Sequence, residues 1–299
     1  MTATRDSGII VDLTDTEAFR NRITKEGIHP GTFSQFQKSI LSFYNHEGRD
    51  MPWRHTTNPF HILVSEIMLQ QTQVDRVRKK YPEFITAFPT FARLADAPLH
   101  EVLAVWQGMG YNRRAIAVQA CARKVMDEYN GILPSDAEVL KTLPGIGHAT
   151  ACSIAAFAFN RPVVFIETNI RRVFIHLFFH DRSSVHDREI LPLAEKALYR
   201  KNPRVWYWAM MDYGAALKNA IPNPNRKSTH YTKQATFKGS DRQIRGIVIG
   251  LLLKAPGQDE QDLLKTIPHD PARVHRIIEG LVAEGFITRK GKALVIRDC

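Results

Sequence analysis

The stretch Leu143-Pro144-Gly145-Ile146-Gly147 lies between two segments whose apolar residues recur three and four positions apart. Glycines at this spacing let the backbone turn tightly at the start of the helix expected over 149–159. Exposed amides at such a helix start, together with the helix dipole, form a site for one phosphate group. An ordinary helix–helix turn would have the same five residues, so the interpretation depends on the rest of the chain.

Outward from this turn, the pattern is helical almost everywhere. Helical segments separated by Pro and Gly run from 61 to 158, and another helical region covers 168–218. Few alternating apolar–polar runs occur, which predicts a mainly α fold with short loops. Residues 1–29 lack strong periodicity and are interpreted as an arm with a short helix around 15–25, and Thr32 opens the next helix.

The C-terminal part of the sequence, 240–299, has a different pattern. Helices are expected over 241–253, 259–267 and 271–284, followed by two apolar strands at 286–288 and 293–296 that are joined by a basic turn. Three helices and a hairpin indicate a small winged-helix-like module. Such a module can contact DNA, or it can serve in packing or dimerisation, and the sequence leaves both open.

The charge of the chain indicates a polyanionic partner. The 299 residues carry a net charge of +11, with a pI near 9.7, and nucleic acid is the leading partner for such a protein. Seven Lys or Arg and one acid lie between Lys218 and Arg245. Arg226 and Lys227 in this stretch are candidate DNA contacts, although a solvated loop would also be basic.

Other features of the composition limit the class of protein. The sequence has no apolar run long enough to span a membrane and no apolar leader in its first thirty residues. Three cysteines without metal-ligand spacing suit a reduced compartment, so we expect a cytoplasmic, nucleoid-associated protein without a metal site. Cys121 and Cys152 lie in apolar helical patterns and are expected to be buried.

Glu66 is the first candidate catalytic residue. It lies in the mostly apolar helical stretch 63–69, and a carboxyl group in such surroundings tends towards a raised pKa, which suits a proton donor. Gln70 and Gln71 follow it and offer side-chain amides to base edges. A glutamate in a helix, taken alone, is usually a solvated residue.

A second carboxylate, Glu167, follows the short apolar run 163–166 and precedes Thr168 and Asn169. A carboxylate at the start of a helix is well placed to face a cleft, and the helix dipole favours its ionised form. Simple capping of the helix by Glu167 or Thr168 is the alternative.

Together these stretches resemble the helix-hairpin-helix (HhH-GPD) DNA glycosylase superfamily, and within it the adenine DNA glycosylases of the MutY type. The similarity covers roughly 30–235, and the glutamate-containing run is the most specific part of it. The matching stretches are MPWR at 51–54, VSEIMLQQTQV at 64–74, FPTFARLADAPLHEVLAVWQGMGY at 88–111, LPGIGHATA at 143–151 and AMMDYGA at 209–215.

The resemblance implies a role for each matching residue. Glu66 takes the position of the glutamate that protonates the leaving adenine, and Gln70 that of a glutamine wedged into the base stack. Tyr111 takes the position of a tyrosine near the mispair. Pro144, Gly145 and Gly147 take the phosphate-binding hairpin. The flipped-out base is then expected between two helical subdomains.

Cleavage of the glycosidic bond passes through an oxocarbenium-like state, so the reaction requires one carboxyl group that donates a proton and one carboxylate that stabilises positive charge. Glu66 suits proton donation, and Glu167 suits stabilisation of positive charge on the sugar, with Asn169 in the expected place behind it. The family normally has aspartate at position 167, and the extra methylene could displace the carboxylate by about an ångström.

Two further departures from the family concern its chemistry and its cofactor. Ala149 stands where relatives with lyase activity carry a catalytic lysine, so base removal without strand cleavage is expected. The places of the four cluster cysteines fall on Lys218, Asn225, Ser228 and Gln234 in ungapped register. None is a thiolate, so no 4Fe–4S cluster and no other cofactor are expected.

The expected organisation is an arm at 1–29, a glycosylase domain at 30–239 and the winged-helix-like module at 240–299. Within the domain, a six-helix subdomain covers about 54–164, and a second subdomain is built from 30–53 and 165–235. The module is unlike the family's usual domain for reading oxidised guanine.

The expected function is a monofunctional DNA glycosylase of base excision repair. It would be a monomer that acts on double-stranded DNA and removes adenine mispaired with guanine or 8-oxoguanine. A thymine or uracil mismatch DNA glycosylase and a non-catalytic protein that binds damaged DNA are the alternatives.

Overall fold

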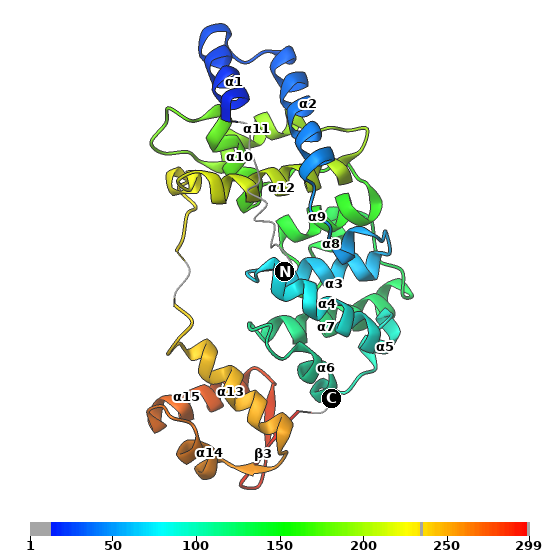
Figure 1. Cartoon of the computed structure of the whole chain (residues 1–299). Helices are drawn as coiled ribbons and strands as arrows, with labels where there is room; N and C mark the ends of the chain where they lie inside the picture. The colour runs from blue at the N-terminus through cyan, green and yellow to red at the C-terminus, as the bar shows by residue number, and fades with distance from the viewer. Residues whose placement is uncertain (1–12, 234–235, 298–299) are drawn as a thin grey trace, which may run out of the picture. The chain divides into compact units, whose positions relative to one another are not determined.

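The structure is a computed structural model that describes residues 13–233 and 236–297 (Figure 1). Helices dominate these residues, and the strands form one small sheet near the C-terminus, so the mainly α prediction is confirmed. Among the described helices, none combines the length and the apolar character that a membrane span requires.

The chain divides into two compact units, which are described separately. Unit 1 contains 1–51, 135–138 and 147–233, and unit 2 contains 52–134, 139–146 and 234–299. The division differs from the subdomain boundary expected near 164. Helix α9 (His148–Phe159) belongs to unit 1, where it packs against α12 (Pro203–Ala220).

Unit 1 is a helical bundle around an aromatic core. Phe36 lies at its centre, with ring centroids 5.6 Å from Phe174 and 5.5 Å from Trp206. Helix α12 contacts α2, α9 and α10. The elements of unit 1 are α1 (Leu13–Glu26), α2 (Pro30–Glu47), α9, α10 (Thr168–Phe178), α11 (Asp187–Ala197), α12 and the 3₁₀ helix η2 (Pro224–Lys227).

Helix α1 packs on the bundle, which the interpretation of 1–29 as an arm did not foresee. Phe19 is 6% exposed and meets Phe178 edge to face at 5.5 Å. Arg20 Nε donates to the His176 carbonyl at 2.8 Å. The expected helix at 15–25 is therefore confirmed and is part of the core, whereas residues 1–12 lie outside the described residues.

Unit 2 begins with a second helical bundle. The buried rings of Phe84 and Trp106 meet at 5.7 Å, and α7 lies against α5, α6 and α3. The two cysteines expected to be buried, Cys121 and Cys152, are buried in α7 and α9 respectively. The elements are η1 (Pro52–Arg54), α3 (Pro59–Leu69), α4 (Val74–Ala87), α5 (Phe91–Ala95), α6 (Leu99–Trp106), α7 (Arg113–Tyr129) and the short α8 (Ala137–Leu140), which crosses the unit boundary.

The winged-helix-like module completes unit 2, and its α13 contacts α6. The three helices and the hairpin lie where the sequence predicted them, and a third strand, β1, pairs antiparallel with β3 to give the order β1-β3-β2. The elements are α13 (Asp241–Lys254), β1 (Gln258–Asp259), α14 (Glu260–Thr266), α15 (Pro271–Ala283), β2 (Ile287–Lys290) and β3 (Ala293–Ile296) (Figure 1).

Candidate active site and DNA-contact loops

Helix α3 presents Glu66 on a narrow accessible strip. Asn58 caps the helix by accepting from the amides of Phe60 and His61. Ser65, Ile67 and Met68 are buried beside Glu66, which is partly exposed. Leu69 and Gln70 are also partly exposed. Positions three and four apart share one helix face, so Glu66 and Gln70 lie one turn apart on the same strip.

Two loops with unusual backbone geometry follow helices α3 and α6. Gln71 has φ of 53° and Tyr111 has φ of 47°, both in the left-handed region that residues other than glycine rarely adopt. Such strain persists only where the surroundings enforce it, and it is common at ligand sites. Both residues line one cavity. Gln71, a candidate DNA contact, and Tyr111, which the family resemblance places near the mispair, therefore lie beside the same cavity.

Arg114, at the start of α7, holds both loops in place. Its NH1 donates to the carbonyls of Ile67 (2.9 Å) and Met68 (2.8 Å) at the end of α3. Its NH2 donates to Thr72 Oγ1 (2.9 Å) and to the Gly110 carbonyl (3.1 Å). The side chain is buried, and burial lowers the pKa of Arg114 to about 10, so it stays charged near neutral pH. Arg114 thereby fixes the loops that carry Gln71 and Tyr111.

We expect Arg114→Ala to lower the free energy of unfolding by about 3 kcal/mol, because several buried carbonyls lose a charged donor at once. The base-release rate should fall with it, since both loops lose their support. Urea unfolding of the full chain measures the first effect. Arg113→Ala removes the adjacent, 76% exposed side chain and should cost less than about 1 kcal/mol. Equal losses in the two variants would contradict the role given to Arg114.

The hairpin Leu143–Gly147 is tied to the α3 loop. Gln70 Nε2 donates to the Gly145 carbonyl at 3.1 Å. Gly145 has φ of 77°, and a Cβ there would lie 2.7 Å from the Cβ of Ala117, so glycine is required. Gly147 caps α9, and Pro144 lies inside the turn that the hydrogen bond from the Ile146 amide to the Leu143 carbonyl closes. The predicted wedge residue and the predicted phosphate-binding turn thus lie side by side.

Glu167 is the N-cap of α10 in unit 1. Its Oε1 accepts from the backbone amides of Asn169 and Ile170, both at 2.7 Å, and its Oε2 accepts from Asn169 Nδ2 at 3.2 Å. Burial raises the pKa of Glu167, whereas the two amides and Arg172 act in the opposite direction. The capping alternative is therefore realised. Capping also fixes the carboxylate in one orientation.

Asn169 connects Glu167 to the bundle behind it. Asn169 Oδ1 accepts from Arg172 NH1 at 2.7 Å, and the same NH1 donates to the Gly214 carbonyl at 2.5 Å. A Cβ on Gly214 would lie 2.5 Å from the Asn169 carbonyl oxygen, so only glycine allows α12 to approach this closely. The conformation of Glu167 is thus held by a chain of contacts that reaches α12.

Protein hydrogen bonds support the loop where the family has its cluster. Asn225 is 3% exposed and donates Nδ2 to the Thr168 carbonyl at 2.9 Å. Ser228 is 7% exposed, and its Oγ accepts from the His230 amide. Asn225 and Ser228, like Lys218, offer no thiolate, and Gln234 lies outside the described residues. These residues do not fit an iron–sulfur cluster.

The two basic candidates of this loop differ in their surroundings. Arg226 is exposed, as a residue that contacts DNA phosphate must be. Lys227 is half-buried and donates Nζ to the His180 carbonyl at 2.6 Å. Its ammonium group therefore anchors the loop to the segment after α10. A DNA contact by either residue stays a prediction.

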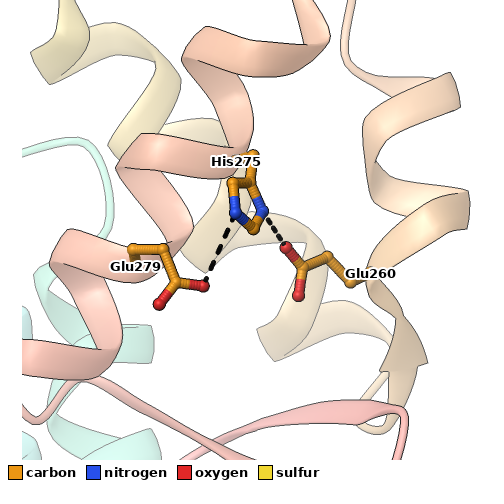
Figure 2. Close-up of side chains that lie close together, drawn as sticks. All are labelled: Glu260, His275 and Glu279. Atoms are coloured by element: carbon orange, nitrogen blue, oxygen red, sulfur yellow. Dashed lines mark hydrogen bonds and ion pairs between the residues drawn. The ribbon is translucent and has the colours of Figure 1, made fainter.

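A cluster in the C-terminal module has the residue types of a metal site. Figure 2 shows His275 between Glu260 and Glu279, with His275 Nδ1 2.6 Å from Glu260 and Nε2 4.0 Å from Glu279. Arg289 also contacts both carboxylates. A cation there would have to displace the Arg289 guanidinium, so we interpret the cluster as an ion-pair network that joins α14, α15 and β2.

Comparison with known proteins gives the family. Residues 64–197 match the HhH-GPD superfamily of base excision DNA repair proteins. The adenine DNA glycosylase of Mycobacterium tuberculosis is 31% identical over 281 residues, which cover 84% of this chain and 90% of the relative. The chain belongs to the adenine DNA glycosylase branch of the HhH-GPD superfamily.

Two relatives named for thymine or uracil are also similar to this chain. The thymine/uracil-DNA glycosylase of Methanothermobacter thermautotrophicus is 30% identical over 186 residues, which cover 61% of this chain and 84% of that protein. The structure of a thermostable thymine-DNA glycosylase matches with a TM-score of 0.55 and 28% identity, over 61% of this chain and 86% of that one. The helical glycosylase fold is thereby confirmed.

Sequence reasoning missed Arg114, Arg242 and Arg245 as parts of the site. One signal was present: Arg113 and Arg114 follow Tyr111 in the first turn of a helix, where the dipole disfavours positive charge. A basic pair in that position therefore indicates a partner elsewhere. Arg242 and Arg245 gave no such signal, because only the tertiary fold brings α13 to the same cavity.

Proposed function

We propose that this protein is a monofunctional adenine DNA glycosylase of base excision repair that hydrolyses the N-glycosidic bond of adenine mispaired with guanine or 8-oxoguanine. The observation that carries the proposal is Glu66, held on the accessible strip of α3 one turn before Gln70. Relatives that align with most of the chain are adenine DNA glycosylases. The partner is double-stranded DNA, and we expect one copy of the protein to act alone.

Each step of the reaction has a residue suited to it. Extrusion of the base costs a few kcal/mol, and a mispair lowers that cost. Glu66 then donates a proton to the leaving adenine, which makes it a neutral leaving group. The Glu167 carboxylate stabilises the positive charge that develops on the deoxyribose, through Oε2, because Oε1 is committed to two backbone amides. Water completes the hydrolysis.

Strand cleavage is not part of this reaction. Ala149, in the first turn of α9, cannot form a Schiff base with the sugar. The product is therefore an intact strand with an abasic site, which breaks only on later treatment with alkali.

The test is single-turnover base release from duplexes that carry A·G, A·8-oxoG, T·G or U·G. Adenine release from the first two, without strand cleavage, is the expected result. Pyrimidine release without adenine release would replace the proposed activity with the thymine or uracil alternative. Tight binding of a mispaired duplex without release of any base would favour a non-catalytic DNA-binding protein.

The thymine/uracil alternative has one observation in its favour. The two relatives named for thymine or uracil are 30% and 28% identical to this chain, and each match covers 61% of it. The mycobacterial adenine DNA glycosylases, in contrast, align over 83–84% of the chain. Because of this greater coverage, we propose adenine as the excised base.

The protein is proposed to work without a metal cofactor. Asn225 and the residues around it take over the support of the loop at 221–233. Protein purified anaerobically should contain no stoichiometric iron, and a chelator should leave its unfolding transition unchanged. Asn225→Ala should lower the free energy of unfolding by about 1 kcal/mol, because the bond to the Thr168 carbonyl is lost. Iron analysis and urea unfolding test this, and iron in constant ratio to protein would contradict it.

A further inference from the structure

A cavity of about 460 Å³ lies in unit 2 beside the loops that carry Gln71 and Tyr111. One side is formed by Gln70, Gln71 and Tyr111, and the other by α13 of the winged-helix-like module, which contributes Arg242 and Arg245. The module therefore supplies part of the wall of the cavity that the mispair-contacting loops surround. This places arginine side chains from a separate module beside two residues proposed to meet the DNA stack.

The arginines around this cavity have different tasks. Arg114 donates hydrogen bonds to backbone carbonyls, as described above. Arg113 and Arg245 both bind Glu284: Arg113 Nε and NH2 lie 2.7 Å from its two oxygens, and Arg245 NH1 and NH2 lie at 2.9 and 2.5 Å. The hydrogen bonds from Arg113, followed by those from Arg245, lower the pKa of Glu284 to about 2. Glu284 thus stays ionised and clamps the module onto the start of α7.

Arg242 is positioned in another way. Its guanidinium carbon lies 4.8 Å from the centroid of the Tyr111 ring, and its NH1 also donates to the Tyr111 hydroxyl. A guanidinium that stacks on an aromatic ring is held as a flat fork, a shape that suits recognition of two adjacent acceptors. Arg242 therefore brings an oriented fork to the cavity, whereas the clamp fixes Arg245.

The rest of the module is poorly suited to general DNA binding. Residues 240–299 contain ten Lys or Arg and eight Asp or Glu. On α15 and β2, Arg273 pairs with Asp241, and Arg289 pairs with Glu260 and Glu279. The net charge of the module, ten basic minus eight acidic residues, is only +2, which is little for tracking a phosphate backbone. Its contribution is local and lies at the cavity.

We propose that Arg242 reads the base opposite the excised adenine, and that the ligand class is a purine with two acceptors on one edge, as guanine has in N7 and O6. 8-Oxoguanine carries a hydrogen on N7, so Arg242 would favour A·G over A·8-oxoG. This inference rests on the proposed function. Arginine pairs with that edge through two parallel hydrogen bonds, and pyrimidines do not offer the same edge. The module thereby gives specificity to a site whose chemistry lies in the glycosylase bundle.

The experiment is single-turnover release of adenine from duplexes with guanine, 7-deazaguanine or cytosine opposite the target. Wild-type protein should favour guanine over both others by about tenfold, because 7-deazaguanine lacks the N7 acceptor. Arg242→Ala should abolish that preference, and Arg242→Lys should do the same because lysine keeps the charge but not the fork. Arg276→Ala, which removes an exposed arginine of the same module, should keep it.

The outcomes separate the two proposals. No adenine release by the wild type would overturn the proposed function. If wild type and Arg242→Lys released adenine with the same preference for the opposite guanine, the role of Arg242 in recognising that base would be overturned, whereas the proposed function would stand. A uniform loss in all three duplexes, with a salt dependence reduced by about one phosphate contact, would show that Arg242 binds the backbone and would also overturn it. Arg242→Lys decides the question even if the alanine variant does not fold.

Discussion

Replacing Glu66 with glutamine is expected to lower the rate of adenine release by at least about 10²-fold, and up to about 10⁴-fold, which is the usual contribution of a general acid. Glutamine matches glutamate in size, so the neighbouring side chains of Ser65 and Ile67 need not move. The variant loses the transferable proton and keeps the shape of α3. Affinity for a duplex with a mispair should therefore change little. Single-turnover release and fluorescence anisotropy measure the two quantities.

The matched control is Glu83→Gln in the neighbouring helix α4. Glu83 is 56% exposed and pairs with Lys80 at 2.6 Å, so its loss removes the same charge from unit 2 away from the strip of Glu66. We expect its activity to stay within about threefold of wild type, because exposed ion pairs contribute little. If Glu66→Gln were fully active, Glu66 would not be the proton donor, and the group that protonates the leaving base would be unassigned.

The helices and the C-terminal module were predictable because their apolar residues follow one period over many residues. Helices α13, α14 and α15 each lie within a residue or two of the expected range. Strand β1 was missed because Gln258 and Asp259 are polar and show no alternation, so that only pairing with β3 makes them a strand. The packing of α1 was missed for a related reason: Phe19 is one aromatic residue in a polar helix, and its partner Phe178 is far along the chain.

The candidate site was predicted in part. The resemblance named Gln70, Tyr111 and Gly145 singly, and the structure connects Gln70 to the Gly145 carbonyl. The support of these loops could not be predicted, because it depends on the contacts of one side chain, that of Arg114, with two carbonyls and a hydroxyl that lie 42 to 47 positions away in the sequence. Sequence periodicity predicts which residues face a core. The hydrogen-bond partners of a buried arginine are set by the tertiary fold and are not visible in the sequence.

Glu167 gives the second large effect, and here two substitutions separate capping from chemistry. Glu167→Gln keeps an oxygen that can accept from the Asn169 and Ile170 amides but removes the negative charge. The release rate is therefore expected to fall by about 10²-fold, a typical loss for one electrostatic group at a transition state. The thermal unfolding temperature should change little, because the cap remains.

Glu167→Asp tests the position of the carboxylate, because it keeps both the cap and the negative charge. Aspartate is a favoured N-cap residue, so α10 keeps its start, and the negative charge remains while the carboxylate withdraws by about one ångström. We expect this variant to retain activity, since family members normally have aspartate there. Glu167→Ala loses both cap and charge and should lose about 1 kcal/mol of stability as well as activity. If Glu167→Asp were inactive but as stable as wild type, the pocket would be built around the longer side chain. If Glu167→Gln were fully active, the carboxylate would serve only as the cap of α10, and another group would have to stabilise the charge on the sugar.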